Sequence, residues 1–524
     1  MTVRFQRRRW GLHILGALVW LAAGCGDDGP RTDADAVGSD ADSGADDSGT
    51  DDSGTLDVSS DGSVATDAVD DGAIEDTATD GFDVRGLYAV RNPTNGLSWY
   101  VAWTTSVPAD TTLEVDCGDE AWTIHGDVLG TDHEVFASGF WAGAQCTLTA
   151  IGIAADGAMG RASIGLEVEG AGFEVPGVEV VATRPEAMEP GWTLVDLSDA
   201  RLRERPAVAM IDAAGRIRWV HRLDGIPVAR GNQVAAHPEG VLTGGMRNSP
   251  ARFVTWEGRE TWRATFDSHH EGFRMPDGER FVHLEPRQPC PDGIPAVAPV
   301  VMRDYASQDV LWRWMLCDHV APPTPFQDWD HNNGIAFAPD ESWWVLSARH
   351  QNALYAVDTA SGELLWTMGF GGRPDDGFAG DFAMAEEDRF LEQHAPQILD
   401  DGHIVLFDNG SCTACPDETE GDWRRESSRA IEIAWDADAG TAAVVWEFVP
   451  EPPIHAEIWG DADRLPGGTT LVTFGRKAET TYVIEADAAG EEVWRMSYTR
   501  PAWGSYRAER VPPVYGFVTL PQGE

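Results

Sequence analysis

The chain has 524 residues, and its 38 lysines and arginines against 87 aspartates and glutamates give a formal net charge of −49. A body this acidic repels nucleic acid and anionic lipid at long range, so we expect no nucleic-acid partner. An anionic substrate would need a local cluster of arginine and histidine side chains.

Residues 1–25 are typical of an export signal. Three arginines at 7–9 precede an apolar run, Ile14 to Ala23, that is too short to span a bilayer. The run ends in Leu-Ala-Ala-Gly-Cys, which resembles a bacterial lipobox and implies cleavage before Cys25 and lipidation of that residue. An ordinary signal peptide cut nearby is the alternative. We therefore expect an exported lipoprotein on the periplasmic face of the membrane or at the cell surface, with the lipid as its only membrane contact. The residue after Cys25 is Gly26 and not the aspartate that would signal retention in the inner membrane, so the outer membrane is favoured.

Residues 26–82 form an acidic segment with 18 Asp or Glu and one Arg, filled out mostly by Ser, Gly, Thr and Ala. Such a segment cannot bury enough apolar surface to offset its ordering entropy, so we predict a disordered tether. Calcium binding is the alternative interpretation.

Six cysteines remain once Cys25 is assigned to lipid, an even number that suits an oxidising compartment. Proximity favours one of the 15 possible pairings: Cys117–Cys146, Cys290–Cys317 and Cys412–Cys415. The last pair is predicted to be a short loop staple, because no zinc partner pair and no thioredoxin-like setting accompanies it.

Residues 83–175 alternate apolar and polar positions with frequent turn signals, which predicts a small β domain. Expected strands include Trp99–Trp103, Thr112–Asp116 and Cys146–Ala150. The stretch from Ser98 to Ile164 resembles a fibronectin-III-type sandwich, a fold that indicates a spacer or support and not an activity.

Residues 177–524 contain a repeat, in which an apolar strand, a turn and a strand with Trp recur. The copies start 44 to 76 residues apart, at Ala209, Phe253, Met302, Tyr355, Ile431 and Val483. A second half-unit, a turn followed by a strand, recurs at Asp277-Gly278, Asp401-Gly402 and Gly467-Gly468. Four strands per unit and six units predict a six-bladed β-propeller with Trp packed between blades. Tyr506 to Val518 is predicted as an extra inner strand that completes the first blade. The fold class is therefore all-β, a six-bladed propeller after a small sandwich.

Histidines stand at equivalent places in three successive repeats: His269 and His270, His331, and His394. His270 and His394 each lie seven residues before a turn, and His331 lies nine before the equivalent one. In a closed ring, equivalent positions converge on one end of the central axis, just before the inner strands.

Arg349 lies at the far end of the strand region that begins after His331, where a short connection could return it to the channel. Weaker candidates from other blades are Arg230, Arg429, His455 and Arg507.

Imidazoles beside a guanidinium suit a tetrahedral oxyanion such as a sulfuryl group, and a neutral imidazole can also be the nucleophile. The sequence has no glycine-rich phosphate loop and no Cys-x-Pro-x-Arg sulfatase pattern. We expect no cofactor and no metal; a metal site from Asp330, His331 and another histidine is the alternative, although no short pair such as His-x-x-x-His supports it.

The chain resembles the bacterial arylsulfate sulfotransferases in five motifs, which occur in the family's order. They are Asp-Trp-Asp-His-Asn-Asn at 328–333, Ser-Ala-Arg-His-Gln at 347–351, Gln-His at 393–394, Leu-Phe-Asp-Asn-Gly at 406–410 and Ser-Arg-Ala-Ile-Glu-Ile at 428–433. The resemblance implies a periplasmic six-bladed propeller that moves sulfate from an aryl sulfate donor to a phenolic acceptor by a ping-pong route, without a nucleotide donor.

The resemblance also implies roles for individual residues. His394 would be the nucleophile, His331 and Arg349 would bind the sulfuryl oxygens, and His269 or His270 would lie beside them. It supports a short disulfide loop at Cys412–Cys415. The oligomeric state stays open, with a homodimer as one option.

Two rival functions remain. One is a non-catalytic surface propeller lipoprotein that binds protein or glycan; the segment Ala356 to Trp366 also resembles repeats of eight-bladed quinone-dependent dehydrogenases and assembly-factor lipoproteins. The other is a sulfate-ester hydrolase on the same fold, with water as acceptor.

Overall fold

The computed structural model describes residues 82–518, with gaps at 127–128, 174, 176, 198–206, 224–232, 246–248, 322–327, 370–379, 412–424, 478–479 and 500–504. The export signal with Cys25, the tether up to residue 81, Arg230 and the Cys412–Cys415 pair lie outside the described residues. No helix in the described part is long and apolar enough to cross a membrane.

The described chain is built from β-strands, together with four single 3₁₀ turns: η1 Pro185–Ala187, η2 Pro291–Gly293, η3 Leu316–Asp318 and η4 Arg349–Gln351. This confirms the all-β prediction.

The N-terminal strands form one connected antiparallel sheet. They are β1 Val84–Arg91, β2 Trp99–Asp116, β3 Ala121–His125, β4 Gly130–Ala137, β5 Gln145–Ala154 and β6 Met159–Glu167. The sequence predicted separate strands at 99–103 and 112–116, but β2 runs through both. Its first half pairs with β1 and β4 and its second half with β3 and β5. The fibronectin-type resemblance and the domain boundaries 83–175 and 177–524 stay predictions.

Six antiparallel sheets follow, and they are the blades of a β-propeller. Blade 1 contains β8 Trp192–Leu197, β9 Ala207–Ile211, β10 Ile217–Arg222 and β31 Ala508–Val511. Blade 2 contains β11 Gln233–His237, β12 Gly240–Gly244, β13 Ala251–Thr255 and β14 Glu260–Arg263. Blade 3 contains β15 Gly272–Arg274, β16 Arg280–Leu284, β17 Val300–Asp304 and β18 Val310–Trp314.

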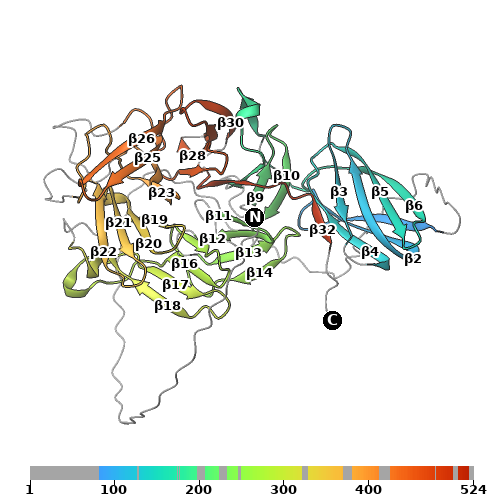
Figure 1. Cartoon of the computed structure of the whole chain (residues 1–524), viewed down its shortest axis with the longest axis horizontal. Helices are drawn as coiled ribbons and strands as arrows, with labels where there is room; N and C mark the ends of the chain where they lie inside the picture. The colour runs from blue at the N-terminus through green and yellow to red at the C-terminus, as the bar shows by residue number, and fades with distance from the viewer. Residues whose placement is uncertain are drawn as a thin grey trace, which may run out of the picture. The chain divides into compact units, whose positions relative to one another are not determined.

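Blade 4 contains β19 Asn332–Phe337, β20 Trp343–Ala348, β21 Ala353–Asp358 and β22 Leu364–Gly369. Blade 5 contains β23 His394–Ile398, β24 Ile404–Asp408, β25 Arg429–Asp436 and β26 Thr441–Phe448. Blade 6 contains β27 Asp461–Arg464, β28 Thr470–Lys477, β29 Thr480–Ala486, β30 Glu492–Thr499 and β7 Glu179–Ala182. In Figure 1 the sheets follow one another in chain order around a common centre.

Burial explains the strand pattern within a blade. Middle strands such as β9 and β24 are buried along their whole length and apolar except for Asp408 at the end of β24, because neighbouring blades cover both of their faces. The outer strand β26 instead alternates between buried and more exposed positions. The Asp-Gly turns between first and second strands put Gly278 and Gly402 at φ of 72° and 85°, where a side chain would be strained.

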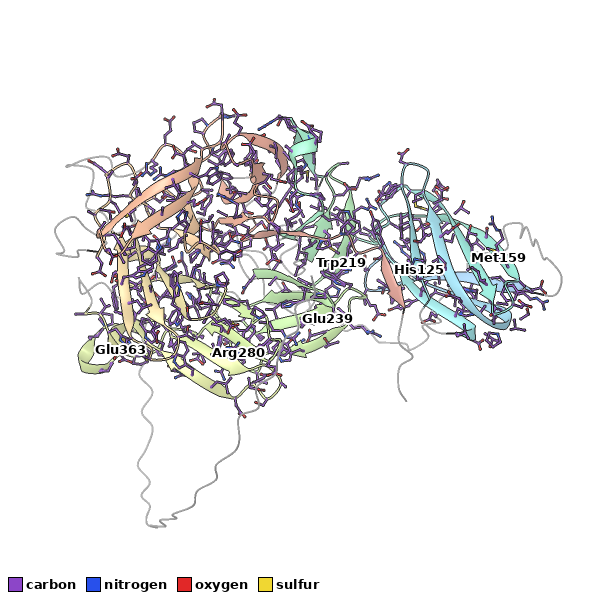
Figure 2. The ribbon with its side chains drawn as sticks, viewed as in Figure 1. His125, Met159, Trp219, Glu239, Arg280 and Glu363 are labelled. Carbon is purple, nitrogen blue, oxygen red and sulfur yellow. A yellow bond between two sulfur atoms is a disulfide. The ribbon has the colours of Figure 1, made fainter. Side chains whose placement is uncertain are left out.

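Tryptophans join neighbouring blades around the ring. Trp219 of β10, labelled in Figure 2, is fully buried, and its Nε1 donates to the Trp256 carbonyl of blade 2 at 2.7 Å. Equivalent bonds join Trp262 to Tyr305, Trp314 to Gly362, Trp446 to Asp487 and Trp494 to Ala213. Between blades 4 and 5 the rings of Trp366 and Trp435 pack at 5.1 Å. The prediction of inter-blade tryptophans is confirmed.

The C-terminal segment closes the ring with a shorter strand than predicted. β31 pairs with β8 of blade 1 as expected. The prediction is wrong beyond Val511, because β32 (Gly516–Val518) pairs with β4 of the N-terminal sheet. Pro512 and Pro513 have no N–H to donate, so the ladder to β8 cannot continue through them.

The predicted disulfides Cys117–Cys146 and Cys290–Cys317 are both formed. Cys290 immediately precedes η2 and Cys317 lies in η3, so the second disulfide closes the segment that contains β17 and β18 of blade 3.

Candidate active site

The histidines meet at the start of the inner strands of three successive blades. His269 and His270 precede β15, His331 precedes β19, and His394 is the first residue of β23. The His270 ring lies 5.0 Å from that of His331, and Tyr506 lies 6.2 Å from His270 and 6.4 Å from His394, centroid to centroid. The structure therefore brings the histidines that the sequence singled out into one cluster.

His394 is held in one tautomer. Its Nδ1 lies 2.7 Å from Oδ1 of Asn409 and 3.0 Å from the Glu392 carbonyl. Asn409 cannot turn its amide around, because its Nδ2 donates to the carbonyls of Ala456 and Trp459, both at 2.8 Å. Both neighbours of Nδ1 are thus acceptors, so the proton sits on Nδ1 and the Nε2 lone pair is available. Within the described part of the chain nothing hydrogen-bonds to this Nε2.

The His394 ring is neutral. The residue is 2% exposed, and burial, followed by the charge of Arg349, lowers the pKa of His394 well below its usual range. A neutral imidazole with an open Nε2 is a nucleophile.

Arg349 is held by two neighbours and keeps one donor unused. Its Nη2 pairs with the Glu392 carboxylate, and its Nη1 donates to His350 Nε2 at 3.1 Å. Its Nε is buried and has no hydrogen-bond partner among the described residues. Arg349 lies in η4 after β20, the second strand of blade 4, which itself returns the chain to the channel mouth. This donor is available to an anionic group, and its place beside the histidine cluster distinguishes it from other buried arginine Nε atoms.

His269 and His270 form a pair whose Nδ1 atoms lie 2.9 Å apart. One Nδ1 must donate and the other accept, so in two neutral rings the accepting ring carries its proton on Nε2. Burial, followed by His269 and His331, lowers the pKa of His270 well below its usual range. The pair thus supplies one Nε2–H whichever way the bond runs.

His331 is bonded to a carboxylate. Its Nδ1 lies 2.6 Å from Asp328 Oδ2. Burial, followed by the charge of Arg349, lowers the pKa of His331 to about 3. The ring is therefore neutral, with its proton shared toward Asp328.

The backbone of the site is strained. Six of the eight described non-glycine residues with positive φ lie in this cluster or beside it: His270, His331, Asn352, Glu392, Ala395 and Trp459. Each such conformation costs on the order of 1–3 kcal/mol and persists only where the surrounding fold imposes it. Strain of this kind collects at functional sites.

A buried ion pair lies beneath the histidines. The guanidinium of Arg507 binds both carboxylate oxygens of Glu271. Burial raises the pKa of Asp461 to about 6 and that of Glu509 to about 7, so these carboxyls next to the pair are reluctant to ionise. Both terminal nitrogens of Arg507 are thereby occupied by Glu271.

The other weak candidates serve the fold. Arg429 pairs with Asp408 and Glu447. His455 lies 3.0 Å from the Ser411 hydroxyl through Nε2. Neither joins the histidine cluster in the contacts described.

Among the described residues, two groups of side chains have spacings that could hold a metal ion: Asp328, His331 and His350 in the cluster, and Asp401, His403 and Glu432 on blade 5. Arg287 and Arg349 adjoin the first group, and Arg464 pairs with Glu432 of the second. These guanidinium charges disfavour a cation at either place. The alternative with Asp330 is weak for the same reason, since Arg287 pairs with that carboxylate at 3.1 Å.

Sequence reasoning missed the residues that hold the cluster in place: Asp328, His350, Glu392, Asn409 and Tyr506. Asp328, His350 and Asn409 lie inside the motifs that carry the family resemblance, so the signal was present but unassigned. Tyr506 and Glu392 had no signal in the repeat.

A separate cavity of about 320 Å³ lies away from the cluster and is lined by residues of the N-terminal sheet and β10, among them Arg91, Phe173 and Arg222. The Arg91 side chain donates to the carbonyls of Gly96 and Gly170.

A family model described as Arylsulfotransferase (ASST) matches residues 177–507. Among curated proteins, none matches the chain. Similar solved structures include a protein of unknown function from Bacteroides caccae (12% identity, 58% of this chain and 93% of that chain, TM-score 0.36). Another is the periplasmic gluconolactonase PpgL of Pseudomonas aeruginosa (13% identity, 77% of this chain and 100% of that chain, TM-score 0.35). A third is the Cps50 (Swd1) β-propeller domain of Myceliophteria thermophila (9% identity, 64% of this chain and 90% of that chain, TM-score 0.34). Similarity this low says nothing about a shared activity.

Proposed function

The chain belongs to the arylsulfotransferase (ASST) family, and we propose that it moves a sulfuryl group from an aryl sulfate ester to a phenolic acceptor through a sulfated His394. The observation that carries the proposal is the His394 ring, which is neutral, locked with its proton on Nδ1, and open at Nε2. The unused Nε of Arg349 supplies the adjoining anion-binding donor.

In the first half-reaction, His394 Nε2 attacks the sulfur of the aryl sulfate. The N–S bond forms, the S–O bond to the aryl oxygen breaks, and the electron pair leaves with the phenolate. The Nε–H of Arg349 and the Nε2–H of the His269–His270 pair bind the sulfuryl oxygens and spread their charge. Sulfuryl transfer needs alignment and charge stabilisation above all, as phosphoryl transfer does.

In the second half-reaction, the oxygen of the phenolic acceptor attacks the sulfur of sulfated His394, and the phenol gives up its proton. The new O–S bond forms, the N–S bond breaks, and His394 recovers its lone pair. Asn409 keeps the ring in register throughout, because its amide is fixed by two backbone carbonyls. No nucleotide donor is part of this proposal.

The test is mass spectrometry of the intact protein and its peptides after brief incubation with 4-nitrophenyl sulfate at mildly alkaline pH. We expect a sulfate-mass adduct on the peptide containing His394, lost when phenol is added. His394→Gln should carry no adduct. His403→Gln should behave as wild type, because His403 lies beyond the Asp401-Gly402 turn at the opposite end of β23 and β24.

The rival functions give different results. Release of nitrophenol at a rate that does not depend on phenol would indicate a hydrolase that uses water. No adduct and no nitrophenol release with a panel of aryl sulfates would contradict the transferase proposal and favour a binding propeller.

We also propose that the protein is an exported lipoprotein, anchored through Cys25 and held off the membrane by residues 26–82. The two disulfides support export to an oxidising compartment. Metabolic labelling with a fatty-acid analogue should tag the wild type and not Cys25→Ala; equal labelling of both would contradict the anchor.

A further inference from the structure

Asp328 and His331 form a bonded pair to which the transfer steps above assign no role. His331 Nδ1 lies 2.6 Å from Asp328 Oδ2. A carboxylate accepts and the ring N–H donates, so the pair fixes the proton on Nδ1 and leaves the lone pair on Nε2. Within the described residues His331 Nε2 has no hydrogen-bond partner.

The carboxylate of Asp328 is itself fixed. Arg287 binds its other oxygen, Oδ1, and also binds Asp330 at 3.1 Å. The backbone carbonyl of Asp328 accepts from His350 Nδ1 at 2.7 Å. His331 is thus oriented by a group that is held on both sides, as a catalytic ring must be.

His331 lies among the residues proposed to hold the sulfuryl group. Its ring centroid is 5.0 Å from that of His270 and 4.5 Å from that of His350, and His350 accepts from Arg349. His270 and Arg349 belong to the set proposed to bind the sulfuryl oxygens, and His350 holds Arg349. A neutral His331 bonded in this way has no N–H left for a sulfuryl oxygen, which separates it from the role that the family resemblance implied.

Resting on the proposed function, we propose that His331 carries the proton of the phenol through Nε2 and that Asp328 is its positioning residue. In the second half-reaction the phenol O–H gives its proton to His331 Nε2 while the oxygen forms its bond to sulfur. In the first half-reaction the protonated ring gives a proton to the aryl oxygen as the S–O bond breaks. Because the ring is neutral in the empty site, it takes a proton from solvent as the aryl sulfate binds and gives that proton to the leaving phenolate. The proton it then takes from the acceptor phenol returns to solvent as the product leaves, so His331 ends each cycle neutral.

The surroundings favour both halves of this cycle. Burial and the charge of Arg349 lower the pKa of His331 to about 3, so the empty site presents a neutral base. A bound aryl sulfate adds a negative charge, and with Asp328 it favours the protonated ring when the donor is present.

The test measures the rate of the first half-reaction alone with two aryl sulfates that differ in their leaving group. Rapid quench stops the reaction, and the sulfated peptide that contains His394 is then quantified. A 4-nitrophenolate leaves without a proton, whereas phenolate needs one. In His331→Asn and Asp328→Asn we expect a loss of about 100-fold with phenyl sulfate and less than about threefold with 4-nitrophenyl sulfate.

The second half-reaction gives an independent readout. Sulfated enzyme is mixed with phenol across pH 6 to 9. The variants should react only with phenolate, so their rate should rise about tenfold per pH unit, while the wild-type rate stays nearly flat. His403→Gln is the matched control, because its ring also bonds to a carboxylate, Glu432, at 2.7 Å but outside the cluster.

If the variants lost the same factor in sulfation rate with phenyl sulfate and with 4-nitrophenyl sulfate, the inference would be overturned and His331 would be a sulfuryl ligand. If neither rate fell, His331 would have no role in the first half-reaction. Far-UV circular dichroism checks that the variants are folded. A wild-type protein that never carries sulfate on His394 would refute the proposed function itself, and this inference with it.

Discussion

The protonation state of His394 gives a prediction that separates the proposed nucleophile from an ordinary histidine. Lowering the pH from 8 to 5 should change the rate of His394 sulfation by 4-nitrophenyl sulfate by less than about twofold, because burial and Arg349 lower the pKa of His394 well below 6.5. An unperturbed histidine with a pKa of about 6.5 would be only about 3% neutral at pH 5 and would lose about 30-fold in rate. The assay is a single-turnover quench with the sulfated peptide quantified by mass.

Asn409→Asp supplies the matched perturbation. A carboxylate 2.7 Å from His394 Nδ1 favours the imidazolium and should raise its pKa by about 1–3 units, so the variant's rate should fall as the pH drops toward 5. The wild type and the variant should therefore differ most at pH 5. A wild-type profile with a midpoint near pH 6.5 would refute the reasoning, since it would mean that the ring titrates as in solvent.

Three further predictions test the channel, the anion site and blade 3. Burial raises the pKa of Glu509 to about 7, so the folded state keeps a proton that the unfolded state has lost, and this group alone lowers the free energy of unfolding by about 3 kcal/mol as the pH rises from 4 to 8. In urea titrations the free energy of unfolding of Glu509→Gln relative to the wild type should therefore rise by about that amount over this range. A difference that does not depend on pH would contradict the reasoning. Arg349→Lys should slow His394 sulfation by about 100-fold, because lysine lacks the Nε donor and the fork that holds it, and a change confined to KM would count against this role. The double substitution of Cys290 and Cys317 by serine should cost about 3 kcal/mol in unfolding free energy under oxidising conditions, an effect that should vanish when the wild type is reduced.

The fold could be predicted because each blade has the same pattern of buried and exposed strands. A buried middle strand, a tight turn and an outer strand with Trp recur in each copy, so the pattern survives insertions such as the one before Ile431. The end of the ring could not be predicted in full. Pro512 and Pro513 break the ladder after β31, and the sequence alone does not say that β32 then finds β4.

The site could be predicted at the level of strand register. His331 and His394 occupy the same place in successive blades, and closure of the ring brings equivalent places together. The partners that decide their chemistry could not be predicted, because Asn409 begins the segment after a second strand and Asp328 comes from a loop. Neither residue belongs to the repeated strand pattern, so the spacing of the blades does not predict where its side chain lies.

Strain explains why the repeat carries the scaffold while the loops carry the chemistry. A residue such as Glu392, at φ 49°, holds Arg349 with its carboxylate and His394 with its carbonyl only because its backbone adopts a conformation that non-glycine residues avoid. A glycine at position 392 would relieve the strain but would lack the carboxylate. In a regular strand conformation, the Glu392 carboxylate and carbonyl would point in other directions. The rigid blades on either side supply the energy that keeps such residues in place, so the function depends on positions where local preference and the fold disagree.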